Sequence, residues 1–178
     1  MHDESGTAAR RPDRDPGGHT TDGSRHASTL LALSQLPPLV DKELGVSEWF
    51  SIDPPSINEF ADFNSDRQSI HADEELARAR PYGETIACGF HAPSILFGWA
   101  SGALSVVKRR QNPINCGLNS VRFITPGRRG ERVRGRFTLK QVTTRNTTSI
   151  PLTNGAMVEI ENHHKPALVA ERTMPINT

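Results

Sequence analysis

The sequence is poor in cysteine and in excess charge, and each shortage excludes a class of protein. Its 178 residues include two cysteines, Cys88 and Cys116, which are too few for a disulfide framework and are not spaced like metal ligands. Basic residues number 21 and acidic residues 20, so the net charge of +1 provides no general attraction to nucleic acid or to an anionic membrane. A reducing, cytoplasmic setting is therefore expected.

The sequence also lacks a long apolar run. A membrane-spanning helix needs about 20 consecutive apolar residues, and the longest apolar neighbourhood, residues 95–107, is interrupted by glycine and serine. Residues 1–28 contain no aliphatic residue larger than alanine after Met1, so we expect a disordered N-terminal tail without the apolar stretch of a signal peptide. Residues 29–178 are enough for one domain with its own core.

Helical periodicity marks several segments between residues 53 and 109. The first helix is expected to follow Asp53 or Ser56, since either is a suitable N-cap, and its apolar residues are Ile57, Phe60, Ala61 and Phe63. A polar loop over 66–73 and a short helix over 74–80 follow. The most apolar helix is predicted over 92–109, and its internal glycines, Gly98 and Gly102, indicate a close packing partner.

Period-two alternation predicts an antiparallel sheet in the second half of the chain. Valine, glycine, phenylalanine and leucine alternate with arginine, threonine and lysine over 131–140, which is typical of a half-buried strand. The predicted strands are 115–125, 131–142, 147–160 and 166–174, with a further strand over 46–52. The fold class is therefore α+β, with an antiparallel sheet wrapped around one long central helix.

Two segments carry a specific resemblance to a known family. They are FADFNSDRQSIHADEELA, residues 60–77, and PYGETIACGFHAPSIL, residues 81–96. Together they resemble the signature of the MaoC-like family of (R)-specific enoyl-CoA hydratases and dehydratases, in particular its nodulation-protein-N-like branch. A third segment, residues 116–135, resembles the family's strand and turn after the central helix. The resemblance implies a single MaoC-like domain with the hot-dog fold, in agreement with the predicted order of elements.

The resemblance implies a reaction and the residues that perform it. Hydration of a trans-2-enoyl-CoA to an (R)-3-hydroxyacyl-CoA needs a base, an acid and donors to the enolate oxygen. Asp66 and His71 would diverge by about 140° on a helix, whereas in an irregular loop they can converge on one water. The resemblance implies Asp66 as the main base, His71 as the group that holds the water and passes a proton, and the Gly89 N–H as the oxyanion donor. Neither a cofactor nor a metal is expected.

The sequence departs from the family pattern in places that affect substrate preference. The residue before Gly89 is often histidine in the family and is Cys88 here, and Phe97 stands where some relatives have a hydroxyl residue. The arginines between 122 and 136 are interpreted mainly as a solvated strand face, with one or two available for coenzyme A phosphates. The residues expected in substrate binding are Gln68, Ile70, Tyr82, Ser94 and Arg122.

Several alternatives to the hydratase remain open. One is a dehydratase that acts on a carrier-protein-bound or branched acyl thioester, and another is a non-catalytic acyl-CoA-binding partner subunit. A thioesterase fits the Asp/His loop less well, and a nucleic-acid role lacks aromatic residues interleaved with the arginines. A homodimer is expected, because a single hot-dog domain exposes one sheet face and a strand edge.

The composition of the tail generates the first prediction. Deletion of residues 1–28 should leave the melting temperature and the catalytic turnover nearly unchanged, because the segment has too little apolar surface to pack against the domain. Thermal melts and assays of the full and truncated chains test this, and a large fall in melting temperature would contradict it.

Overall fold

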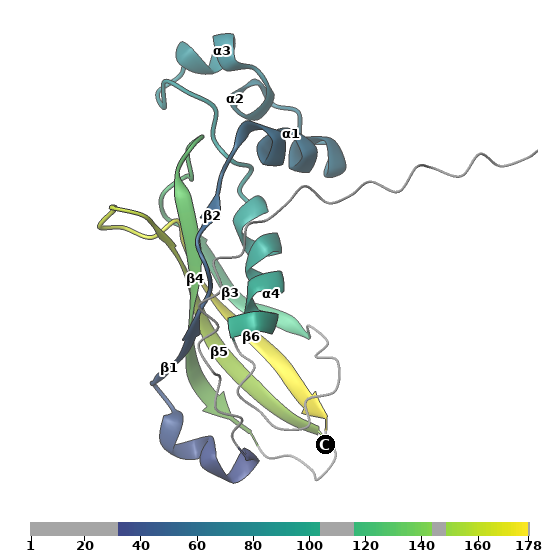
Figure 1. Cartoon of the computed structure of the whole chain (residues 1–178). Coiled ribbons are helices and arrows are strands. Elements are labelled where there is room, and N and C mark those ends of the chain that lie inside the picture. The colour runs from purple at the N-terminus through teal and green to yellow at the C-terminus, as the bar shows by residue number, and fades with distance from the viewer. Residues whose placement is uncertain (1–31, 104–115, 144–148, 178) are drawn as a thin grey trace, which may run out of the picture.

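The computed structural model describes residues 32–103, 116–143 and 149–177 (Figure 1). The predicted tail over 1–28 and the predicted end of the long helix over 104–109 lie outside these ranges. In chain order, the elements are η1 (Leu33–Gln35), η2 (Pro37–Leu39), β1 (Glu43–Val46), β2 (Phe50–Ser51), α1 (Pro54–Phe63), α2 (Ser69–Ala72), α3 (Glu74–Arg78), α4 (His91–Ala103), β3 (Gly117–Phe123), β4 (Arg132–Val142), β5 (Ser149–Ile160) and β6 (Leu168–Asn177).

The strands form one antiparallel sheet with α4 against one face (Figure 1). Their order is β1-β4-β5-β6-β3, and β2 also pairs with β4. The predicted alternation on β4 is confirmed: Val133, Phe137 and Leu139 are buried, whereas the arginines between them are not. The predicted hot-dog architecture, a sheet curled around a central helix, is the one observed.

Small residues make room for the helix on the sheet. Phe137 pairs with Ala156, which pairs in turn with Ala170 on β6, so one large ring lies beside two small side chains. On the opposing surface, Leu96 and Ala100 of α4 are buried one helical turn apart. Phe137 is 1% exposed, and it forms part of one continuous apolar core with these residues.

Helix α1 begins as its sequence predicts. Asp53 is the N-cap, and its Oδ1 accepts a hydrogen bond of 2.8 Å from the Ser56 N–H. Pro54 occupies the first helical position, where the missing N–H costs no hydrogen bond. Of the two residues considered for the cap, Asp53 is therefore the correct one.

Two local predictions need correction. The polar loop over 66–73 contains the single-turn helix α2, in which the Gln68 carbonyl accepts from the N–H groups of His71 and Ala72. One turn is too short to produce a visible hydrophobic period. The strand predicted over 46–52 is two short strands, β1 and β2, which pair with different parts of β4.

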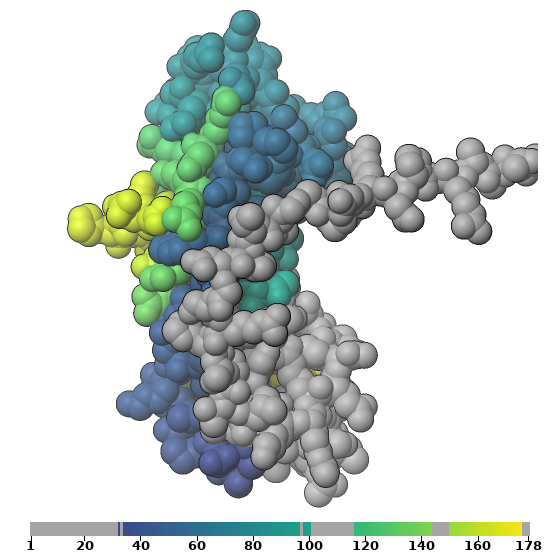
Figure 2. Space-filling view, viewed as in Figure 1, coloured from purple at the N-terminus to yellow at the C-terminus, as the bar shows by residue number. Residues whose placement is uncertain are grey.

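The helices α1–α3 lie beyond one end of the sheet, away from η1 and η2. Figure 2 shows this cluster at the top of the molecule, with η1 and η2 at the bottom. The chain leaves the cluster through residues 86–89 and enters α4, so these helices overhang the start of α4. No helix in the described ranges is long and apolar enough to cross a membrane.

Gly98 of α4 does not have the role that the sequence predicts. A Cβ built on Gly98 meets no atom within 4 Å, so no partner packs closely there. The surroundings of Gly102 lie outside what the structure describes. The close approach is instead on the sheet: a Cβ on Gly135 of β4 would lie 2.9 Å from Leu96 Cδ1 and 3.0 Å from Phe137 Cζ.

The contact at Gly135 generates a stability prediction. Gly135→Val should destabilise the protein by about 1–3 kcal/mol, because the added methyl groups overpack the contact between α4 and the sheet. Gly117→Val is the matched control, since Gly117 lies on exposed β3 with no atom within 4 Å of its Cβ. Denaturant unfolding measures both variants; equal stabilities would show that α4 does not need glycine at position 135.

Candidate active site

A cavity of about 480 Å³ opens where α4 begins, between the overhanging helices and the end of the sheet. Its apolar wall comes from segments far apart in the chain, from β4 and β6 of the sheet to α4. The polar groups gather on the side of the overhanging helices. The apolar lining includes Ile52, Ile70, Ile86, Ile95, Val133 and Leu168, and the polar lining includes Asp66, Gln68, His71, Tyr82, Cys88 and His91.

His71 is buried and held from one side. It lies on α2 with its side chain 6% exposed, and its Nδ1 is 2.8 Å from the Ile86 carbonyl oxygen. A carbonyl oxygen only accepts hydrogen bonds, so this contact places the ring proton on Nδ1 and leaves Nε2 as the free ring nitrogen. The backbone at Ile86 is also bonded to α2 in the other direction, because the Ile86 N–H donates to the Ile70 carbonyl at 3.0 Å.

Asp66 faces His71 from the loop before α2. The Asn64 side chain accepts from the Asp66 N–H at 3.0 Å, and the Gln68 amide donates to Asp66 Oδ1 at 2.9 Å. The other carboxylate oxygen, Oδ2, lies 3.8 Å from His71 Nε2. This distance is longer than a direct hydrogen bond and suits a pair that shares one small polar molecule. Asp66 and His71 therefore converge, because Asp66 lies in the loop before α2 and not on the same helix as His71.

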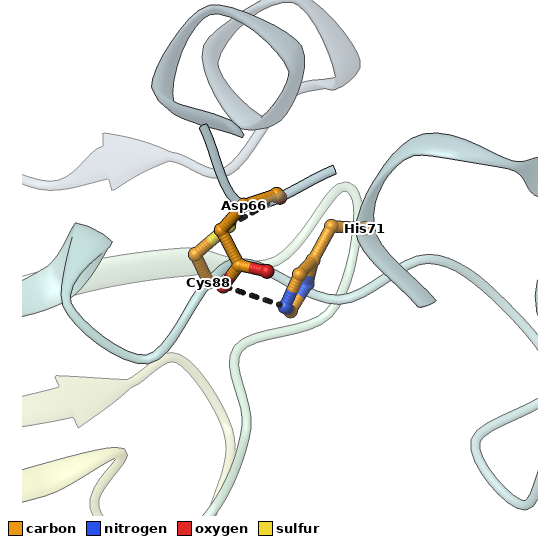
Figure 3. A group of neighbouring side chains, drawn as sticks. All are labelled: Asp66, His71 and Cys88. Atoms are coloured by element: carbon orange, nitrogen blue, oxygen red, sulfur yellow. Dashed lines mark hydrogen bonds and ion pairs between the residues drawn. The ribbon is translucent and has the colours of Figure 1, made fainter. Parts of the chain in front are cut away.

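Cys88 completes the polar end of the cavity (Figure 3). It is 2% exposed, and its Sγ lies 4.0 Å from the Asp66 carbonyl oxygen. Burial, and secondarily the negative charge of Asp66, raises the pKa of the Cys88 thiol. A thiol in this environment is a poor nucleophile at neutral pH, because the thiolate is the reactive form.

Gly89 brings a backbone N–H to the cavity wall. It precedes α4, and within the described ranges its N–H has no hydrogen-bond partner. The protein atoms around Gly89 do not themselves require glycine. A Cβ built there would make an ordinary contact of 3.8 Å with the Phe123 ring.

The residues expected in substrate binding divide into two groups. Gln68, Ile70 and Tyr82 line the cavity, with Tyr82 41% exposed. Ser94 and Arg122 do not line it. Ser94 Oγ donates to the His91 carbonyl at 2.7 Å, and Arg122 is exposed on β3.

Most of the arginines on and before β4 belong to ion pairs. Arg134 Nε is 2.8 Å from Glu159 Oε2, and Arg136 Nε is 2.8 Å from Glu43 Oε2. The hydrogen bond from Arg134 lowers the pKa of Glu159. The guanidinium of Arg134 also lies over the Trp49 ring, 4.4 Å from its centroid. The arginines of this strip are thus paired with glutamates of the neighbouring strands, where the sequence predicted a mainly solvated strand face.

His91 enters the cavity wall at the first residue of α4. It is 5% exposed, its ring stacks on Phe60 with centroids 4.8 Å apart, and Phe50 meets it edge-on. Burial lowers the pKa of His91, and the negative charge of Asp53 opposes this shift. The sequence carries no sign of the contact between Phe60 and His91, which are 31 residues apart.

Comparison with known proteins agrees with this architecture. The model of the MaoC like domain matches residues 36–160. The chain is 39% identical to Nodulation protein N of Rhizobium leguminosarum bv. viciae, over 79% of this chain and 88% of that protein. It is 37% identical to 3-hydroxyacyl-thioester dehydratase Z of Mycobacterium tuberculosis, over 80% of this chain and 94% of that protein.

A solved structure shows the same fold at low sequence identity. The unliganded R-hydratase PhaJ1 from Pseudomonas aeruginosa superposes with a TM-score of 0.66 at 18% identity, over 78% of this chain and 81% of that one. The shared fold includes the long helix packed on an antiparallel sheet, as described above.

The buried His91 ring generates a pH prediction. With its pKa lowered by burial, folded His91 stays neutral at pH values where the unfolded chain binds a proton, so stability is lost as pH falls below about 6.5. His91→Phe keeps the aromatic stack and removes this titration. The free energy of unfolding of the variant should therefore fall less than that of the wild type between pH values of about 7.5 and 5.5. Parallel slopes in denaturant titrations would contradict the assignment.

Proposed function

Because this chain belongs to the MaoC-like family, we propose that it is a hydro-lyase that adds water reversibly to a trans-2-enoyl-CoA, giving an (R)-3-hydroxyacyl-CoA. The observation that carries this proposal is the pair Asp66 Oδ2 and His71 Nε2, which lie 3.8 Å apart at the polar end of an otherwise apolar cavity. A base and a proton carrier beside an apolar chamber are what hydration of an acyl thioester needs.

The proton transfers follow from the positions of the two side chains. A water held between Asp66 and His71 gives a proton to Asp66 as its oxygen forms a bond to C3 of the enoyl group. The π electrons move toward the thioester carbonyl. The proton on Asp66 then passes through His71 Nε2 to C2, which returns both side chains to their starting protonation states. Dehydration is the same path in reverse, so the name of dehydratase Z is compatible with this chemistry. The proposal needs no cofactor.

The Gly89 N–H is proposed to stabilise the negative charge that develops on the thioester oxygen. It lies on the cavity wall without another partner in the described ranges and immediately before α4. The helix dipole makes this end of α4 favourable for negative charge. A donor held in place before the reaction costs no reorganisation, which is why such groups contribute strongly to catalysis.

The apolar wall is proposed to receive the acyl chain. Isoleucine side chains from α2, from residue 86 and from α4 enclose the cavity, and Tyr82 lies on its exposed side. The acyl group would therefore extend toward Val133 and Leu168, while the carrier of the thioester remains toward Tyr82. A carrier-protein or branched acyl thioester fits the same arrangement.

We also propose that the chain forms a homodimer through β3. This strand is at the edge of the described sheet, and Leu118 and Phe123 on it are 38% and 51% exposed. Pairing of two β3 strands would satisfy their free backbone groups and cover these side chains.

The proposed roles of Asp66 and His71 generate a prediction for substitutions of these two residues. Asp66→Asn and His71→Gln should each lower the rate of hydration of crotonyl-CoA by at least about 100-fold, the usual contribution of general acid–base catalysis. Loss of the absorbance of the conjugated thioester measures the rate. Glu75→Gln, on exposed α3 and outside the cavity lining, is the matched control and should retain full activity.

Thermal melts of the variants separate loss of chemistry from loss of fold. Full activity in both site variants would reject the proposed mechanism. Acyl-CoA binding without turnover in the wild type would instead support the non-catalytic partner subunit.

A further inference from the structure

Three donor groups of different chemistry meet at the polar end of the cavity (Figure 3). One oxygen of Asp66, one ring nitrogen of His71 and the Cys88 sulfur all lie within 4.8 Å of one another. Asp66 and His71 are five residues apart, and Cys88 follows 17 residues later on the segment that enters α4. The proposed hydration uses the first two groups and has no role for the thiol.

This donor set matches the preferences of zinc. Zn²⁺ binds cysteine sulfur at about 2.3 Å, histidine nitrogen at about 2.0–2.1 Å and aspartate oxygen at about 2.0–2.2 Å in tetrahedral sites, which places ligand atoms roughly 3.3–3.8 Å apart. The distance from Asp66 Oδ2 to His71 Nε2 is already 3.8 Å. All three ligand atoms lie within 4.8 Å of one another, so the set is about 1 Å wider than a closed zinc site.

The surroundings of His71 are those of a metal ligand. Its Nδ1 is fixed by the Ile86 carbonyl at 2.8 Å, and Nε2 faces Asp66. Ligating histidines are typically oriented in this way, with the second ring nitrogen donating to a carbonyl or a carboxylate. All three donors line the cavity, which can supply a water as the fourth ligand.

We propose that Asp66, His71 and Cys88 bind Zn²⁺, or another divalent cation with affinity for sulfur, and that this ion reversibly blocks the site. The sulfur–metal bond replaces the S–H bond of Cys88, whose proton leaves to solvent. The ion takes the lone pairs of Asp66 and His71 that hydration needs, so substrate turnover stops while it is bound. The inhibition rests on the proposed function, whereas the binding does not.

Metal binding is measured on the full chain after treatment with a chelator. Co²⁺ should produce a thiolate-to-cobalt charge-transfer band in the wild type, and Zn²⁺ should abolish this band by competition. Cys88→Ala and the nearly isosteric Cys88→Ser should lack the band and bind Zn²⁺ at least about tenfold more weakly by calorimetry. Cys116→Ala is the matched control, since Cys116 is the other cysteine and is exposed; it should behave as the wild type.

The same variants separate the two proposals. Zn²⁺ should inhibit the wild type and Cys116→Ala at the same concentration, and a chelator should restore their activity. In whichever of Cys88→Ala and Cys88→Ser turns over substrate, the inhibiting Zn²⁺ concentration should be at least about tenfold higher. A charge-transfer band that persists without Cys88, or activity that resists zinc, overturns the metal site. Metal binding at Cys88 in a protein without hydratase activity supports the metal site and rejects the proposed function.

Discussion

The hydrogen bond between His71 Nδ1 and the Ile86 carbonyl is the constraint on which the arrangement of the site depends. It joins α2 to the segment that continues through Cys88 and Gly89 into α4. The return bond from the Ile86 N–H to Ile70 makes this junction two-sided. The segment is also anchored on its other side, where the Ala87 N–H donates to the Gly127 carbonyl. The position of the polar groups is therefore tied to the position of the central helix.

The sheet in turn determines where that helix lies. Glycine at position 135 and alanines at positions 156 and 170 leave a shallow surface on which Leu96 and Ala100 can pack. Interiors are close-packed, so a larger residue at this contact would displace the helix or strain its neighbours. If α4 moved, its first residues would move with it, and the cavity wall that they form would no longer face the polar side chains on and before α2.

The polar end of the cavity is chemically more versatile than a pair of acid–base groups. A carboxylate and an imidazole beside an apolar chamber suit proton transfer to and from a thioester substrate. The addition of a buried thiol converts the same groups into a set of donors that suits zinc. The proposed catalysis and the proposed metal binding therefore compete for the same lone pairs, which would make the activity of this protein responsive to the metal.

The sequence by itself determined the features that depend on local pattern. Alternation identified β4, helical period and the Asp53 cap identified α1, and the motif around Asp66 and His71 identified the family. Only the tertiary structure decided that Cys88 joins this pair, that Gly135 rather than Gly98 is the close contact, and that Ser94 and Arg122 lie outside the cavity lining. These outcomes depend on hydrogen bonds and packing between segments 15 or more residues apart, such as His71 with Ile86, and no local periodicity encodes such contacts.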